Sequence, residues 1–227
     1  MEEHYIVQVQ SQVQGLVDDL KAVFTHAGLA GEAAEYKLLT QSFLYKFLND
    51  KFLYEALNID ESYDYQGLLN LSEEDYDWFL DDIGTKTAHL KPEQLIESLH
   101  RQQNQADFAE IFEQTLNQIA IDNNAIFSVH TDGGTDIRLF DQRLITDTIS
   151  DTSKRNEVAA SIINLLARVK FDQQIFSQGF DFFSTLFEYM IKDYNKDGGG
   201  KYAEYYTPHS VAKIIAAILV GNDQPSN

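Results

Sequence analysis

The sequence contains no cysteine, only three prolines and a single tryptophan. The absence of cysteine excludes disulfide bonds and thiolate metal sites. No apolar run approaches the roughly 20 residues that a membrane-spanning helix needs. The start, Met1-Glu2-Glu3-His4, has neither the basic region nor the apolar run of a signal peptide. The default expectation is therefore a cytoplasmic protein without a membrane partner.

Basic residues are also scarce, because 17 Lys and Arg stand against 36 Asp and Glu, for a formal net charge of −19. A protein that binds DNA by itself usually presents a basic face. Any contact with DNA must therefore be local, or be supplied mainly by a partner.

Several common site patterns are missing as well. The six histidines are scattered and show no metal-ligand spacing. The sequence has no G-x-S-x-G, no P-loop and no H-E-x-x-H. We therefore assign no catalytic residue and no metal ligand from these patterns.

Apolar residues recur at helical spacing through most of the chain. Only residues 126–140 change period; they suggest a small β-hairpin, with a plain loop as the alternative. The predicted fold class is mainly α, a multi-helix N-terminal domain with at most this one hairpin. The predicted helices cover residues 5–29, residues 32–57 as a central buried helix, a segment that begins at Pro92, residues 108–119, and residues 153–170.

Residues 52–85 contain ten acidic residues and no Lys or Arg. One interpretation is a solvated insertion near residues 58–85 with short helices, held down by Tyr76, Trp78 and Phe79. The other is a docking surface for a basic partner. Both interpretations stay open at this point.

The last fifty residues predict a helix, a glycine-rich loop and a second helix. Phe183, Leu186, Phe187, Met190 and Ile191 mark one buried face, and Val211, Ile214, Ile215, Ile218 and Leu219 repeat that pattern. Thr207 suits an N-cap, and Pro208 suits the first helical position. The free backbone N–H groups of that helix N-terminus would point towards whatever lies above it.

The loop between these helices fits the calcium pattern D-x-[DN]-x-[DN]-G-x5-E. The matching residues are Asp193, Asn195, Asp197, Gly198 and Glu204. Lys201 would place a cation beside the ion, and Pro208 would delay the exit helix. We therefore predict that residues 193–204 do not form a working calcium site.

The segment Glu204-Tyr205-Tyr206-Thr207-Pro208-His209 resembles part of the modification (M) subunit of type I restriction–modification systems, a family of adenine-specific DNA methyltransferases. That family carries G-[EQ]-[FY]-[FY]-T-P just before its methyl-donor domain. Its preceding helix resembles Gly179-Phe180-Asp181 through Glu188-Tyr189-Met190. Its early F-L-K-Y-L-S-D helix resembles residues 41–52.

The resemblance implies that Glu204, Tyr205, Tyr206, Thr207, Pro208 and His209 contribute to binding S-adenosylmethionine. It also implies a specificity subunit and DNA as partners, with a restriction subunit as a further one. The complete enzyme would methylate the exocyclic amine of adenine. Residues 1–175 would form the N-terminal helical domain, and residues 176–227 the first helices of an α/β methyltransferase domain.

The sequence departs from the family pattern in lacking D-P-x-x-G-x-G and the Asn-Pro-Pro-aromatic motif that grips the adenine. These 227 residues alone are therefore predicted to be inactive. The alternative hypothesis is a non-enzymatic acidic interaction module, with calcium bound through residues 193–204.

Overall fold

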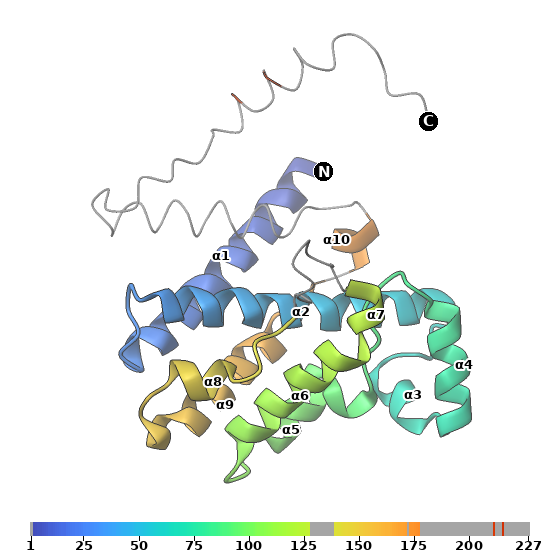
Figure 1. The fold of residues 1–227 in the computed structure, drawn as a ribbon. Helices are drawn as coiled ribbons and strands as arrows, with labels where there is room; N and C mark the ends of the chain where they lie inside the picture. The colour runs from blue at the N-terminus through green and yellow to red at the C-terminus, as the bar shows by residue number, and fades with distance from the viewer. Residues whose placement is uncertain (1, 128–138, 172, 178–210, 212–214, 216–227) are drawn as a thin grey trace. The chain divides into compact units, whose positions relative to one another are not determined.

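The computed structural model describes residues 2–127, 139–171, 173–177, 211 and 215 (Figure 1). Within the first three of these ranges the chain forms ten α-helices and one 3-10 helix, with no strand. This result confirms the predicted mainly α fold. The elements are α1 (Glu2–His26), α2 (Ala33–Ile59), α3 (Tyr65–Asn70), α4 (Glu73–Ile83), η1 (Pro92–Gln94), α5 (Ile96–Gln102), α6 (Phe108–Asp122), α7 (Asn124–Phe127), α8 (Leu144–Thr148), α9 (Thr152–Arg168) and α10 (Gln173–Ser177).

The chain divides into two compact units, residues 1–182 and residues 183–227. The described part of the first unit contains all these elements and is called the helical unit below. The division into domains of residues 1–175 and 176–227 stays a prediction. No helix in the described part of the chain has both the length and the apolar character needed to cross a bilayer.

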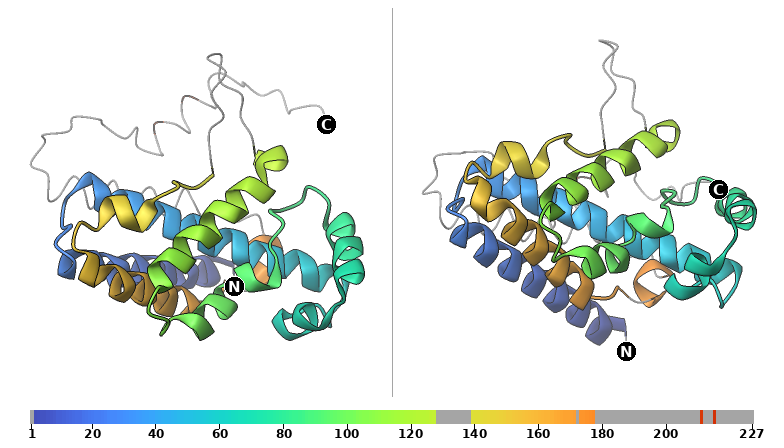
Figure 2. Two further views of the ribbon diagram at one scale, coloured as in Figure 1. Left: turned by 60° about the horizontal axis from the view of Figure 1, so that its bottom comes forward. Right: turned by 90° about the horizontal axis from the view of Figure 1, so that it is seen from below.

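Helix α2 is the centre of the helical unit. Its side chains Leu38, Phe43 and Phe52 are fully buried, and the helix contacts α1, α4, α8, α9 and α10. Helices α1 and α9 run side by side (Figure 2), and α9 also packs on α5 and α6. The prediction of a central buried helix over residues 32–57 is confirmed. A helix that is apolar on more than one face can bury all of them only in such a position.

The turn from α1 to α2 is fixed by backbone hydrogen bonds. Gly28 has a φ of +88°, a conformation that glycine adopts without a steric cost. The Leu29 N–H donates to the Phe24 carbonyl at 3.0 Å, and the Gly28 N–H donates to the Thr25 carbonyl at 3.0 Å. This pair of bonds is a Schellman motif, which satisfies carbonyls that the end of α1 would otherwise leave unpaired.

The acidic segment forms the short helices α3 and α4. Each begins with a side-chain cap, because Asp64 Oδ1 accepts from the Gly67 N–H at 2.8 Å and Ser72 Oγ accepts from the Asp75 N–H at 3.2 Å. Tyr76 and Phe79 are buried as predicted, but Trp78 is 68% exposed. The prediction that Trp78 holds the segment down is therefore wrong.

Two other predicted elements begin differently in the structure. Ile126 and Phe127, the first residues of the predicted hairpin, are the last residues of α7. Residues 128–138 of that hairpin lie outside the described residues, and its last two residues, 139 and 140, form a bend and not a strand. The helix predicted from Pro92 is a 3-10 turn followed by α5, with a break at Leu95, whose φ and ψ of −72° and 147° are extended.

Two buried phenols attach η1 and the chain just before it to α2 and α4. The Tyr45 hydroxyl donates to the Gln94 carbonyl at 2.5 Å, and the Tyr76 hydroxyl donates to the Leu90 carbonyl. Burial raises the pKa of Tyr45 well above its ordinary value of 10.0. Burial also raises the pKa of Tyr76, and Glu93 adds to that shift. In the folded chain both phenols therefore keep their protons at a pH at which an unfolded chain would lose them.

We expect these two phenols to make the protein sensitive to alkali. Because their folded-state pKa values are raised, their contribution is complete below pH 10 and is lost as the pH rises further. Above pH 10, each phenol should remove about 1.4 kcal/mol of unfolding free energy per pH unit. Urea denaturation at a series of pH values measures this slope, and Tyr45→Phe and Tyr76→Phe should each flatten it. An unchanged slope in both variants would contradict the assignment.

Candidate functional site

The predicted donor-binding residues Glu204, Tyr205, Tyr206, Thr207, Pro208 and His209 all lie outside the described residues. The calcium-like loop, residues 193–204, also lies outside them. Among the residues that the structure does describe, no group of three or more His, Cys, Asp or Glu side chains could hold a metal ion.

Two residues beyond the predicted donor segment are described, Val211 and Ile215. Val211 and Ile215 are helical, and they lie four positions apart, which puts them on one face. Their exposed fractions are 42% and 48%. A buried face was predicted for these residues, so that prediction is wrong for both positions.

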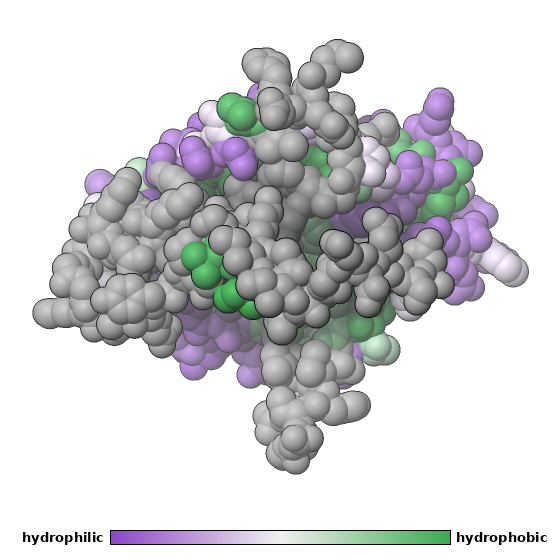
Figure 3. All heavy atoms as spheres, turned by 90° about the horizontal axis from the view of Figure 1, so that it is seen from above, coloured by the Kyte–Doolittle hydropathy of each residue, from purple (hydrophilic) through white to green (hydrophobic). Residues whose placement is uncertain are grey.

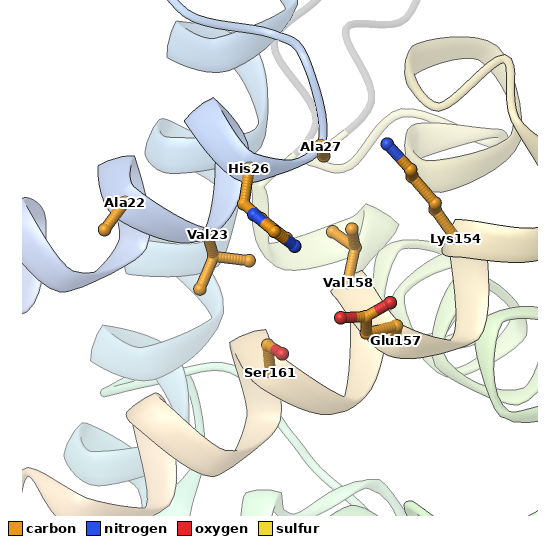
Figure 4. A pocket seen from close by; sticks show the side chains of 8 residues that line it. All are labelled: Ala22, Val23, His26, Ala27, Lys154, Glu157, Val158 and Ser161. Atoms are coloured by element: carbon orange, nitrogen blue, oxygen red, sulfur yellow. The ribbon is translucent and has the colours of Figure 1, made fainter.

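A shallow groove follows the seam between α1 and α9. Its main hollow has a volume of about 270 Å³ (Figure 4). The hollow is lined by Ala22, Val23 and His26 from α1, by Ala27 directly after that helix, and by Lys154, Glu157, Val158 and Ser161 from α9. The His26 imidazole points across the groove towards α9 (Figure 4). The lining mixes both charge signs on an open surface, whereas small-molecule sites are mostly apolar clefts that bury the ligand. This groove therefore suits contact with another macromolecule better than the binding and conversion of a small molecule.

A buried polar cluster on α2 is the most elaborate arrangement in the helical unit. Lys46, Asn49 and Asp50 lie at positions i, i+3 and i+4, on one helix face, and all three are buried. Lys46 Nζ lies 3.0 Å from Asp50 Oδ1 and 2.9 Å from Asp50 Oδ2. Asn49 Nδ2 donates to Asp50 Oδ1 at 2.8 Å. The polar cluster, Lys46-Asn49-Asp50, is therefore an ion pair supported by an amide.

The polar cluster also binds two distant backbone groups. Asn49 Oδ1 accepts from the Ile96 N–H at 2.9 Å, at the start of α5. Asp50 Oδ2 accepts from the Phe171 N–H at 3.0 Å, although the two residues are 121 positions apart. Lys46 Nζ lies 5.5 Å from the centroid of the Phe171 ring. The cluster thus joins α2 to α5 and to the chain that leaves α9.

The electrostatics of the polar cluster follow from its burial. Burial lowers the pKa of Lys46 from its ordinary value of 10.5, because a charged ammonium is disfavoured away from water. The Asp50 carboxylate opposes this shift by attraction and by accepting a hydrogen bond, while Lys170 adds to it by repulsion. The Asp50 carboxylate therefore stabilises the charged form of Lys46 in this buried position.

An aromatic contact attaches α10 to α2 just beyond the cluster. The Phe176 ring lies 5.8 Å from Phe47 and 5.3 Å from Tyr54, measured between ring centroids. Lys51 Nζ lies 4.7 Å from the Tyr54 centroid and 5.6 Å from the Phe176 centroid. Together with the Asp50–Phe171 bond, these contacts form what we call the exit anchor, which holds Phe171 and helix α10 on α2.

Sequence reasoning assigned no role to Lys46, Asn49 or Asp50. A usable signal was present, because three polar residues at helical spacing interrupt the most apolar helix of the chain. Polar groups on a buried face must find partners, and here the partners are each other and two backbone N–H groups. Their partners at positions 96 and 171 could not be read from local spacing.

The segment that follows the exit anchor matches a known family. Residues 178–227 match the family model described as N-6 DNA methylase. The match supports an adenine methyltransferase family, and it includes all six of the predicted donor-binding residues, 204–209. Neither the curated proteins nor the solved structures compared with the chain include a match to it.

Proposed function

We propose that the chain is the N-terminal part of the modification subunit of a type I restriction–modification system, whose complete protein transfers a methyl group from S-adenosylmethionine to the exocyclic amine of adenine in DNA. The observation that carries this proposal is the N-6 DNA methylase match over residues 178–227. The resemblance of residues 41–52 to the early helix of that family supports it, because these residues lie in α2, at the centre of the helical unit.

The donor segment has chemistry that suits S-adenosylmethionine. A helix that begins at Pro208 would offer free backbone N–H groups to the donor's carboxylate. The rings of Tyr205 and Tyr206 would offer faces to an adenine ring or a sulfonium. When bound, S-adenosylmethionine supplies the activated methyl group, and residues 204–209 would hold and orient it. Methyltransferases that act on a base also take that base out of the duplex, which requires further residues.

The helical unit would hold the start of the segment that matches the family model, residues 178–227. The exit anchor holds Phe171 and helix α10 on α2 through the Asp50–Phe171 bond and the Phe176 contacts. The family match begins at residue 178, so the last anchored residue, Ser177, directly precedes it. A rigid start for this segment would limit the orientations that it can take relative to α2.

The charge of the chain bears on its partners. A net charge of −19 repels phosphates, and the carboxylates of α4 are exposed. We therefore assign most of the DNA contact to residues other than the described surface, with a specificity subunit as the main supplier of positive charge. A restriction subunit would be a further member of the complex.

The proposal is tested by donor titration with the full-length protein. Thr207→Ala should weaken S-adenosylmethionine binding about five-fold, because a lost hydrogen bond is worth roughly 1 kcal/mol. Tyr206→Ala should weaken it further, since an aromatic surface is lost as well. Calorimetry at a temperature at which all variants are folded measures both effects.

Val211→Ala is the matched control. Val211 is 42% exposed, so its truncation should change neither donor affinity nor stability by much. Unchanged affinity in both Thr207→Ala and Tyr206→Ala would overturn the site. Transfer of labelled methyl groups to DNA, read as N6-methyladenine, tests the activity itself; its absence from the full-length protein with its partners would overturn the function.

A further inference from the structure

Helix α4 presents an aromatic side chain that the fold does not use. Tyr76, Phe79 and Ile83 form its buried face. Trp78 lies on the opposite side and is 68% exposed. Within the described residues, its indole has no ring contact and no hydrogen bond. Tryptophan is enriched among the residues that contribute most of the binding energy at protein interfaces.

Carboxylates surround Trp78 along the helix. Residues three and four positions apart are neighbours on a helix surface, and at these positions relative to Trp78 the chain has Glu74, Asp75, Asp81 and Asp82. All four are exposed. We call Trp78 and these four residues the α4 patch. At the edge of the molecule where α4 lies, hydrophilic residues predominate with apolar ones among them (Figure 3).

No cation of the helical unit pairs with the α4 patch, and the nearest one along the chain is the exposed Lys86, four positions after Asp82. Residues 52–85 contain no Lys or Arg. Among the described residues, no ion pair involves the patch, and the only hydrogen bonds to its carboxylates come from Ser72 to Asp75. The α4 patch is therefore a set of negative charges around an aromatic ring, and none of these charges forms an ion pair within the described residues.

The position of two of these charges also works against the helix. Asp81 and Asp82 lie in the last turn of α4, which contains no basic residue. A helix C-terminus carries a partial negative charge, so anions there destabilise the helix and cations there stabilise it. Asp81 and Asp82 therefore destabilise α4, and a cation from a binding partner would reduce that destabilisation.

Elsewhere in the helical unit, an aromatic ring and a carboxylate together bind a cation. The Arg101 guanidinium lies 4.9 Å from the centroid of the Tyr65 ring. Its Nη2 lies 3.2 Å from a Glu97 carboxylate oxygen. One aromatic ring and one carboxylate thus hold one guanidinium. The α4 patch offers the same two kinds of group, with the indole as the stronger cation-binding ring.

We propose that the α4 patch is a docking surface for an arginine- or lysine-rich segment of a partner protein. One cation of that segment lies on the Trp78 ring, and its neighbours pair with Asp81, Asp82 and Glu74. Charge complementarity selects this occupant. Nucleic acid carries the wrong sign, and a second copy of this chain, with the same charge of −19, is repelled. This surface is separate from the donor segment and does not depend on the proposed function.

The test uses the intrinsic fluorescence of the full chain. Trp78 is its only tryptophan, so the emission reports on this patch alone. The probe is a peptide of alternating arginine and glycine, and the control peptide has citrulline in place of arginine. We expect the arginine peptide to shift the emission saturably, with an affinity that falls as salt is added, and the citrulline peptide to cause no shift.

Two variants locate the binding by anisotropy of a labelled arginine peptide. Trp78→Ala should weaken binding about three-fold, the loss of one exposed cation–π contact. Asp81→Asn with Asp82→Asn should weaken it about five-fold, the loss of two exposed ion pairs. Asp107→Asn with Glu110→Gln removes the same charge from exposed positions on another part of the unit, and should change the affinity little. All variants should keep the wild-type circular-dichroism spectrum.

Three outcomes would overturn the proposal. Equal weakening by the Asp81/Asp82 and Asp107/Glu110 variants would mean that the peptide senses net charge only. A peptide that saturates without changing the Trp78 emission binds elsewhere. A shift produced by calcium alone, with none from the arginine peptide, would count equally against a protein partner.

Discussion

Asp50→Ala is expected to destabilise the helical unit by about 3–5 kcal/mol, the usual cost of removing one partner of a buried ion pair. The substitution leaves the Lys46 ammonium buried without its counter-ion and the Phe171 N–H without its acceptor. Chemical denaturation followed by circular dichroism measures the loss. Hydrogen exchange at the Phe171 amide should rise in the same variant, because that N–H is freed directly.

The matched control for Asp50 is Glu97→Gln. Glu97 and Arg101 also form an i,i+4 ion pair, but their side chains are 53% and 56% exposed. Exposed pairs contribute roughly 0.2–1 kcal/mol, so this variant should lose about that much. The double variant Lys46→Met/Asp50→Ala should lose less than the sum of its single variants, because it leaves no unpaired charge. A loss in Asp50→Ala no larger than that in Glu97→Gln would contradict the role of the cluster.

Asn123→Leu should have the second large effect. The Asn123 side chain is fully buried. Its Oδ1 accepts from the His89 N–H at 2.6 Å, and its Nδ2 donates to the His89 carbonyl at 2.8 Å and to the Ile119 carbonyl at 2.9 Å. Leucine has a similar volume but leaves both polar groups of the His89 backbone unpaired. Since each unpaired buried group costs about 1–3 kcal/mol, we expect a total loss of roughly 2–5 kcal/mol.

Denaturation of Asn123→Leu is best compared with that of Asn70→Ala. Asn70 also donates to a backbone carbonyl, that of Gln66 at 2.9 Å, but in an exposed position. Water can replace that bond, so its loss should cost less than about 0.5 kcal/mol. If the two variants lost similar amounts, the pairing of Asn123 with His89 would have no special importance for the loop between α4 and α5.

Periodicity predicted the long helices well, because their burial is decided by a repeated face. Helix α2 and helix α9 appear within two residues of the predicted bounds. The same rule, applied strictly, would have placed Trp78 correctly. Tyr76, Phe79 and Ile83 are spaced three and four apart, and Trp78 falls on the other side of that helix. The spacing of the apolar residues, and not the aromatic character of Trp78, therefore decides which face of α4 is buried.

The short helices and the partners of the polar cluster could not be predicted from the spacing of nearby residues. Helix α8 has five residues, which is too few to show a period. The Asp50–Phe171 bond joins residues 121 positions apart, so nothing in the spacing around either residue indicates it. The candidate donor segment was predicted from family resemblance, and the family match over residues 178–227 supports its broad class; its residue assignments stay predictions.

The pairing of α1 with α9 has a consequence for biosynthesis. Helix α1 ends at His26, and its partner α9 begins at Thr152, so more than a hundred residues must be translated between them. At roughly 5–20 residues per second, the ribosome needs many seconds to deliver α9. During that time the apolar side chains of α1, such as Val13, Val17 and Phe24, which are buried in the finished unit, belong to a helix that lacks one of its packing partners. The nascent chain therefore presents an apolar helix that a chaperone can bind until translation has passed Arg168.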